Sequence, residues 1–215
     1  MNKDLLQTQC DFSPMKSAVK ANLTELSEEI HRIVDALDHE EEYCLLREIT
    51  NMRETFAQIE SLAASFYLEC YLSPYTNKYQ DLSDSVQNLS RKQHGALIVV
   101  RRETPLDLWI QSGLPVGAEL TGSLLESIFY PGGPLHDGAV IIEENTIVSA
   151  SNVLPLSKRQ TEGRKLGTRH RAALGLSERT DALIIVVSEE TGHASFAFKG
   201  NLYPLNVGEI SEGEI

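Results

Sequence analysis

The chain has 215 residues, of which 41% are hydrophobic and 23% are charged, and its formal net charge at pH 7 is −12. These values are typical of a globular chain and exclude wholesale disorder, collagen-like repeats and a small disulfide-stapled domain. The acidic balance argues against nucleic acids and anionic membranes as partners, because the overall field of the protein repels phosphate groups. Most of the acidity lies early: residues 1–90 carry 16 acidic and 7 basic side chains, and residues 91–215 carry 15 and 12.

Cysteine usage and hydropathy predict the compartment. The three cysteines, Cys10, Cys44 and Cys70, form no C-x-x-C pair, and their odd number does not suit a disulfide framework. No stretch reaches the ~18 consecutive apolar residues of a membrane span, and residues 1–20 do not resemble a signal peptide. We therefore expect a cytoplasmic protein in a reducing compartment, with no membrane partner.

A loose arm over residues 1–17 and a helical hairpin over 18–72 are expected first. Hydrophobic residues recur there at steps of four and three, which predicts two amphipathic helices. The first stripe is Val19, Leu23, Leu26, Ile30, Ile33 and Leu37, and the second is Leu45, Ile49, Met52, Phe56, Ile59, Ala63, Phe66 and Cys70. The short polar connection at 38–42 favours an antiparallel return, and Pro74 ends the second helix. The hairpin is either a regulatory or oligomerising element or an ordinary helical cap, and the stripes alone favour the cap.

The rest of the chain predicts a mixed α/β domain. A stripe from Tyr75 to Leu89 predicts a helix, and apolar runs after Gly95 predict strands. The expected strands are 96–100, 106–110, 139–142, 146–150, 181–187 and 194–199, with helices near 124–128 and 169–176. Thr121 or Ser123 can cap the first of these helices, and the tail at 208–215 is expected to fray. The expected fold is thus α/β: a mixed-sheet catalytic domain at 75–215, flanked by helices and preceded by the arm and helical hairpin at 1–74.

Three segments carry residues that a core does not need. The first is Pro134-Leu135-His136-Asp137-Gly138-Ala139, which puts a histidine and a carboxylate immediately before a predicted buried strand. A histidine and a carboxylate at this place can ligate a divalent metal or act as a base. Gly138 leaves room for a ligand to approach the backbone closely. Asp and Gly are also common turn residues, and taken alone the segment favours a turn.

The second segment, Gly167-Thr168-Arg169-His170-Arg171, opens a predicted helix with Thr168 as its expected N-cap. A helix start offers free N–H groups and the positive end of the macrodipole, and the arginines add charge-assisted donors for phosphate oxygens. Six basic residues gather around it: Lys158, Arg159, Arg164, Lys165, Arg169 and Arg171. A solvated basic loop is the alternative, but the cluster, the cap and the glycine together favour an anion site.

The third segment, Ser188-Glu189-Glu190-Thr191-Gly192, follows the predicted strand that ends at Val187. Ligand contacts in α/β sheets commonly gather at strand ends, so Ser188 could bond a phosphate and Glu189 could face a metal. The segment is also a good polar hairpin.

The sequence has no P-loop, Rossmann or H-E-x-x-H motif. The residues by themselves predict an α/β domain with an anion site and a candidate metal carboxylate.

Together the three segments resemble the diadenylate cyclase family. Asp137-Gly138-Ala139 is similar to the DGA motif of the family, and Arg169-His170-Arg171 is similar to its RHR motif, here in the fuller form Gly-Thr-Arg-His-Arg. The Ser-Glu-Glu-Thr-Gly run at 188–192 is also similar to the family. The resemblance covers residues 95–200, and the preceding hairpin resembles the soluble, sporulation-associated branch.

The resemblance implies that two ATP molecules condense to cyclic di-AMP with release of two pyrophosphates, using Mn²⁺ or Mg²⁺. It implies that Asp137 holds the metal or activates the attacking hydroxyl. The implied triphosphate ligands are Thr168, Arg169, His170 and Arg171. Gly138 and Ala139 would line the nucleotide site, with Leu154 near the adenine. Ser188 and Glu189 would contact phosphate and metal, and His136 is a further implied metal ligand.

A two-fold symmetric product made from two identical substrates favours two identical half-sites that face each other across a symmetric interface. We therefore expect a homo-oligomer, at least a dimer for activity and up to a hexamer. We also expect residues 18–72 to hold protomers in an arrangement whose half-sites do not face productively. Two alternatives stay open: a non-catalytic adenine-nucleotide sensor with the same anion site, and an interaction module driven by the hairpin.

Overall fold

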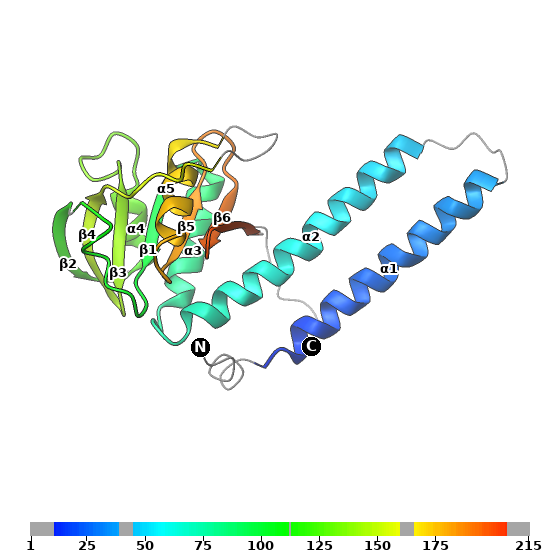
Figure 1. The fold of residues 1–215 in the computed structure, drawn as a ribbon, viewed down its shortest axis with the longest axis horizontal. Helices are drawn as coiled ribbons and strands as arrows, with labels where there is room; N and C mark the ends of the chain where they lie inside the picture. The colour runs from blue at the N-terminus through cyan, green and yellow to red at the C-terminus, as the bar shows by residue number, and fades with distance from the viewer. Residues whose placement is uncertain (1–10, 39–44, 112, 160–165, 206–215) are drawn as a thin grey trace. The chain divides into compact units, whose positions relative to one another are not determined.

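The computed structural model describes residues 11–38, 45–111, 113–159 and 166–205. By its internal contacts the chain divides into two compact units, Met1–Cys70 and Tyr71–Ile215. Figure 1 labels most of the helices and strands of both units. None of the helices in the described ranges is long and apolar enough to cross a membrane.

The first unit is a pair of long helices. α1 spans Ser13–Asp38 and α2 spans Leu45–Leu72, and the two lie side by side (Figure 1). The ring of Phe12, just before the N-terminus of α1, contacts the rings of Phe66 and Tyr67 near the C-terminal end of α2. The ring centroids are 5.3 and 5.8 Å apart. These contacts show that the helices are antiparallel, which confirms the predicted hairpin. The connection predicted at 38–42 lies outside the described residues after Asp38.

α1 begins before the first residue of its apolar stripe. The arm expected over 1–17 is helical from Ser13, because Pro14 has a fixed φ that suits the first helical turn and lacks the N–H that this turn leaves unpaired. The carboxylate of Asp11 accepts a hydrogen bond from the Ser13 N–H at 2.9 Å, which satisfies a donor at the helix start. The rest of the arm, residues 1–10, lies outside the described residues.

Cys70 is disulfide-bonded, which departs from the expectation that the chain has no disulfide. Cys10 and Cys44 both lie outside the described residues. The number and spacing of cysteines could not show this bond, because they do not report which residues the fold brings within bonding distance.

A seven-stranded sheet is the framework of the second unit. Its strands are β1 (Ala96–Val100), β2 (Leu114–Glu119), β3 (Ala139–Glu143), β4 (Thr146–Asn152), β5 (Leu183–Val187), β6 (Ala194–Phe198) and β7 (Asn201–Leu205). Their spatial order is β2-β4-β3-β1-β5-β6-β7. β1 and β3 are parallel and every other neighbouring pair is antiparallel. The sheet is therefore mixed, which confirms the predicted fold class.

Three helices flank the sheet: α3 (Tyr79–Arg91), α4 (Gly122–Ile128) and α5 (Thr168–Ser177). α5 lies on one face, and α3 and α4 lie on the other (Figure 1). The central strands β1 and β5 are buried along their whole length, which explains their continuous apolar sequences. One core cluster joins α5 to the sheet, and it includes Ala172, Ala173, Leu176, Leu97, Val99, Ile184 and Val186.

Two strand predictions differ from the structure. The strand expected at 106–110 is wrong: this segment is a turn, in which the N–H groups of Trp109 and Ile110 donate to the Leu106 carbonyl. The strand β2 follows it instead, and its Pro115 and Gly117 obscured it because neither residue type favours a strand. The apolar pattern also does not predict β7, which contains a proline as well.

Two of the three predicted helix starts are also corrected. α3 begins at Tyr79 rather than Tyr75. Thr121 caps α4 as predicted, since its side chain accepts a hydrogen bond from the Leu124 N–H at 3.3 Å. Thr168 is not the N-cap of α5, because Gly167 occupies that position and gives no side-chain cap; Thr168 is the first helical residue.

Candidate active site

The three segments singled out by the sequence converge at one edge of the sheet. β1 and β3 are parallel and β5 runs against β1, so the starts of β1 and β3 lie at the same edge as the end of β5. This edge therefore carries Asp137-Gly138 before β3 and Ser188-Glu189 after β5. α5 begins beside it, because Arg169 contacts Glu189.

Asp137 and Gly138 form a tight turn into β3. The Asp137 Oδ1 accepts a hydrogen bond from the Gly138 N–H at 2.9 Å, and Asp137 is exposed. Gly138 has a φ of +88°, and a Cβ at this position would lie 2.8 Å from the carbonyl oxygen of Asn152. Glycine is thus needed both for the backbone conformation and for the close approach of β4. Nearby, the Nδ1 of His136 lies 2.5 Å from the carbonyl oxygen of Gly133 in its own loop.

A buried amide supports this turn from β4. Asn152 is 1% exposed, and its Nδ2 donates to the carbonyl oxygen of Ala139 at 2.8 Å. Its Oδ1 accepts from the Gly113 N–H at 2.8 Å, and the Ser149 hydroxyl also bonds the amide. A satisfied amide in the core fixes its partners, because a buried polar group without a partner is costly. No motif in the sequence marks Asn152; the available signal is an amide at the last position of a strand.

Arg169 and Glu189 form the direct link between the second and third segments. The Nη1 of Arg169 donates to the Oε2 of Glu189 at 2.5 Å, and the Arg169 side chain is 19% exposed. Its buried Nε has no hydrogen-bond partner among the residues that the structure describes. A guanidinium has five N–H donors in a planar fork, so Arg169 keeps donors for an anion while it pairs with Glu189.

Glu189 lies on a short turn between β5 and β6 that is anchored on α3. The Ser188 N–H donates to the His193 carbonyl at 3.0 Å, and the Gly192 N–H donates to the Ser188 carbonyl at 2.9 Å. The Ser90 hydroxyl of α3 donates to the Gly192 carbonyl at 2.6 Å. The backbone of the turn is therefore fixed, while the Glu189 side chain stays 64% exposed.

His170 and Arg171 have different surroundings. Burial lowers the pKa of His170, and the negative charge of Glu190 partly opposes this shift. Arg171 is exposed, and its Nη2 lies 3.5 Å from the Ser157 carbonyl. Glu190 therefore acts electrostatically on the second segment. It stands in the third segment of the sequence, but its position there does not indicate this role.

Two residues expected near the nucleotide have buried side chains. Ala139 is 0% exposed and Leu154 is 6% exposed, and both belong to the core cluster beneath α5. Ala139 therefore offers a ligand its backbone rather than its methyl group.

The predicted basic cluster does not gather as a whole in the described part of the chain. Arg164 and Lys165 lie outside the described residues. The Nε of Arg159 lies 3.6 Å from the Oε1 of Glu178, the C-cap residue of α5. Arg159 is thus bound at the opposite end of the helix from Arg169.

The side chains expected to bind a metal are suited to one by type. Carboxylates are ligands for Mn²⁺ and Mg²⁺, and imidazole is a ligand for many divalent metals. In the described ranges, however, no three His, Cys, Asp or Glu side chains gather closely enough to hold a metal ion. Glu189 is engaged by Arg169, so a cation bound there competes with the ion pair.

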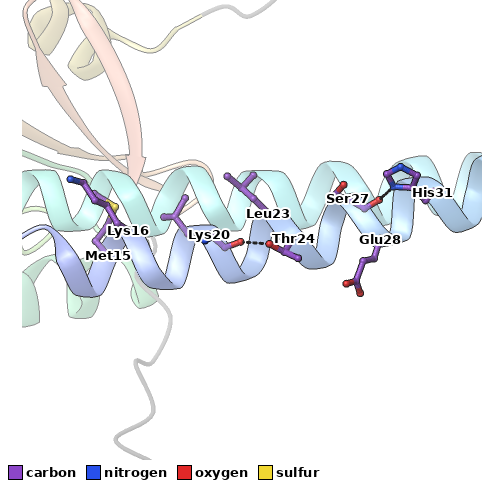
Figure 2. Close-up of a pocket in the computed structure, with 9 residues that line it drawn as sticks. Met15, Lys16, Lys20, Leu23, Thr24, Ser27, Glu28 and His31 are labelled. Carbon is purple, nitrogen blue, oxygen red and sulfur yellow. Dashed lines mark hydrogen bonds between the residues drawn. The ribbon is translucent and has the colours of Figure 1, made fainter.

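A separate hollow lies along α1 alone (Figure 2). Its polar groups are engaged within the helix: the Thr24 hydroxyl donates to the Lys20 carbonyl at 2.8 Å, and the Nδ1 of His31 lies 2.6 Å from the Ser27 carbonyl (Figure 2). The hollow contains none of the residues of the three segments, so we place the candidate site at the sheet edge.

Comparison with known proteins identifies the family of the chain. Residues 83–202 match a family model described as "DisA bacterial checkpoint controller nucleotide-binding", and residues 6–75 match one described as "Diadenylate cyclase CdaS, N-terminal". The chain is 48% identical to a diadenylate cyclase CdaS of Bacillus thuringiensis, over 90% of this chain and 96% of that one. It is 44% identical to a cyclic di-AMP synthase CdaS of Bacillus subtilis, over 94% and 97%.

Two solved structures are also similar to this chain. A crystal structure described as a hypothetical membrane spanning protein from Bacillus cereus has a TM-score of 0.78 and 48% identity, and the match covers 90% of this chain and 94% of that one. DacA from Staphylococcus aureus has a TM-score of 0.56 and 44% identity, over 58% and 83%. The two motif segments, the sheet edge that joins them and these matches lead to one conclusion: the chain belongs to the diadenylate cyclase family, in the CdaS branch, and is a diadenylate cyclase.

Proposed function

We propose that the sheet edge described above is the site at which two ATP molecules condense to cyclic di-AMP. The observation that carries this proposal is the contact of Arg169 with Glu189 at the same edge as Asp137, because it gathers a cationic donor and two carboxylates. Each 3′-hydroxyl oxygen attacks the α-phosphorus of the other ATP, and the two bonds from these phosphorus atoms to pyrophosphate break. The two hydroxyl protons are released, so the products are cyclic di-AMP, two pyrophosphates and two protons.

The roles of the residues follow from what phosphoryl-type transfer needs, which is positioning and charge neutralisation. Asp137 takes the proton of the attacking hydroxyl or holds the metal. The first turn of α5 binds the triphosphate through its free N–H groups and through Thr168, Arg169, His170 and Arg171. Ser188 contacts a phosphate, the backbone of Gly138 and Ala139 lines the nucleotide, and Leu154 lies near the adenine.

Mn²⁺ or Mg²⁺ is the proposed cofactor, and Asp137, Glu189 and His136 are the residues that would hold it. A bound divalent ion neutralises phosphate charge and polarises the bond to the leaving group. The residues of the chain itself bind and orient the nucleotide, and the start of α5 keeps the phosphates next to the sheet edge.

The assembly and the regulation are also proposals. One catalytic domain holding one ATP cannot finish the reaction, so two protomers face each other in the active form, at least a dimer and up to a hexamer. Residues 1–74 are the regulatory part and 75–215 the catalytic domain, and the hairpin holds protomers in an unproductive arrangement. We place the protein in the cytoplasm.

The proposal is tested by incubating the full-length protein with ATP and either Mn²⁺ or Mg²⁺ and separating the nucleotides by chromatography. We expect cyclic di-AMP and pyrophosphate in a ratio of one to two, with specific activity that rises with protein concentration because two protomers must meet. ATP binding without cyclic di-AMP, with either ion and at all protein concentrations, would contradict it.

A further inference from the structure

We propose that Gly95 is a positioning residue of the active site, whose missing side chain makes the space in which Arg169 meets Glu189. The inference rests on the proposed roles of Arg169 in phosphate binding and of Glu189 in metal binding. It concerns a residue that belongs to none of the three segments.

Gly95 is buried immediately before β1, between the start of α5 and the end of β5. A Cβ built on Gly95 would lie 2.5 Å from the Nη1 of Arg169 and 2.9 Å from its Cζ. The same Cβ would lie 2.9 Å from the Cβ of Glu189. All three distances are shorter than a van der Waals contact, so any larger side chain at Gly95 meets both members of the ion pair at once.

The need for glycine here is a need for space and not for backbone conformation. Gly95 has no left-handed φ, unlike Gly138 at the neighbouring strand. Alanine can therefore adopt the same backbone conformation, and the substitution Gly95→Ala adds only a methyl group in a filled place. This makes it a clean steric probe of the ion pair.

The Arg169 guanidinium has little freedom to move away from such a methyl group. It is mostly buried, its Nη1 is bonded to Glu189, and the turn that carries Glu189 is anchored on Ser90. The added methyl group therefore either pushes the guanidinium toward solvent or breaks the pair. Misplacement of a substrate-binding group by about 1 Å can lower a rate by about a hundredfold.

The first test measures stability and does not depend on catalysis. Melting temperatures of the full-length protein are compared for wild type, Gly95→Ala, Arg169→Ala and the double variant, which form a double-mutant cycle. We expect Gly95→Ala to lower the melting temperature. Arg169→Ala in the same chain should recover the part of that loss that comes from the guanidinium, while the contact with the Glu189 Cβ stays. The proposal is overturned if Gly95→Ala lowers the melting temperature equally with Arg169 present and with Arg169→Ala. It is also overturned if neither Gly95→Ala nor the double variant folds.

Gly122→Ala is the matched control. Gly122 also lacks a left-handed φ, and a Cβ there would approach no atom closer than 3.2 Å, the carbonyl oxygen of Asp81. It belongs to α4 and lies outside the proposed site. We expect it to keep the activity of the wild type.

The second test measures turnover of ATP. We expect Gly95→Ala to lower kcat/KM about tenfold or more, mainly through KM, and to have a clearly smaller effect in the Arg169→Ala background. A folded Gly95→Ala variant with unchanged kcat/KM overturns the positioning role. If the wild type makes no cyclic di-AMP, the proposed function fails, and the melting-temperature cycle still decides whether Gly95 positions Arg169.

Discussion

At the scale of single residues, the groups proposed for chemistry and those that hold the fold are different. Asp137 is exposed, and among the described residues its side chain bonds only the N–H of Gly138. Asn152 on β4 is buried and bonds Ala139 at the start of β3 and Gly113. An exposed carboxylate adds little to folding free energy. Substitutions can therefore separate catalysis from stability at this turn.

We predict that Asp137→Asn abolishes cyclic di-AMP formation and leaves the melting temperature unchanged. The amide oxygen of asparagine can still accept the hydrogen bond from the Gly138 N–H, but it cannot take a proton or neutralise a metal. Chromatography of the nucleotides and a thermal melt of the same sample check the two parts. Turnover equal to that of the wild type would exclude the proposed role of Asp137.

A second prediction concerns the pH dependence of stability at His170. Burial lowers its pKa in the folded protein, so on acidification the unfolded chain takes up the proton first. The contribution of His170 to stability is complete above the unfolded pKa, about 6.5, and is lost as the pH falls from there through the lower folded pKa. We therefore expect His170→Gln to lose less unfolding free energy than the wild type between about pH 7.5 and about pH 5.5.

The matched variant for this measurement is Glu190→Gln. Removing the charge that opposes the shift lowers the pKa of His170 further, so this protein should lose more stability than the wild type over the same range. Denaturant unfolding curves at both pH values give the comparison. Identical pH profiles for all three proteins would refute the coupling of His170 to Glu190.

The residue types of the site could be predicted from sequence, but their pairing could not. Arg169 and Glu189 stand in recognisable segments, yet their contact depends on β5 ending beside the start of α5. Thr168 was expected as a cap because its hydroxyl suits that role, but the helix begins one residue earlier, after Gly167. Helix ends are set within one or two residues by the surrounding packing, which local sequence does not encode.

At the scale of elements, the side chain of Asn152 links β4 to β3 and to Gly113 through buried hydrogen bonds. We predict that Asn152→Ala lowers the unfolding free energy by roughly 1–3 kcal/mol for each buried partner left unpaired. Ser149→Ala, which removes only one hydroxyl from the same network, should lower it by less. Denaturant unfolding of both variants measures the two losses. A larger loss for Ser149→Ala than for Asn152→Ala would show that Asn152 is not the main link between these segments.

Elements with one strong local signal were predicted well, and elements shaped by irregular backbone were not. β1 and β5 are continuous apolar runs and lie where the sequence places them. The segment at 106–110 has the composition of a strand, but Leu108 is 86% exposed, because the chain turns there before β2. β2 contains a register shift between Pro115 and Ala118, and a bulged strand breaks the alternation on which strand prediction depends.

At the scale of the whole molecule, the last residues of α2 belong to the second unit. The ring of Tyr71 contacts that of Phe198 at 4.8 Å, and Leu72 is 0% exposed. The Arg102 guanidinium lies 4.6 Å from the ring centroid of Tyr75 in the same region. A chain cut between residues 74 and 75 would therefore lose the Tyr71 ring contact and the buried Leu72 side chain.

We predict that a shortened chain starting at Tyr71 folds and is more stable than one starting at Tyr75. The chain that starts at Tyr75 lacks the buried Leu72 side chain and the Tyr71 ring contact. Their loss should lower its unfolding free energy by roughly 2 kcal/mol or more. Denaturant unfolding of both chains measures the difference. Equal unfolding free energies for the two chains would show that the last residues of α2 do not stabilise the second unit.

The same chain from Tyr71 tests the inhibitory hairpin. If residues before it restrain the protomers, the shortened protein makes cyclic di-AMP at a higher rate per molecule than the full-length protein. The nucleotide assay is run at matched protein concentrations, with a thermal melt as the control for folding. An equal or lower rate from a folded shortened chain would exclude the inhibitory role.

The prolines that made β2 and β7 hard to predict have a consequence for how copies of the chain can associate. β2 and β7 are the two outer strands of the sheet, and they contain Pro115 and Pro204. A proline cannot donate to a strand ladder, and the bulge in β2 further spoils its edge as a template for another strand. Growth of the sheet from one molecule into the next is therefore obstructed on both sides. If copies of this chain associate, we expect contacts between side-chain surfaces rather than pairing of these two outer strands.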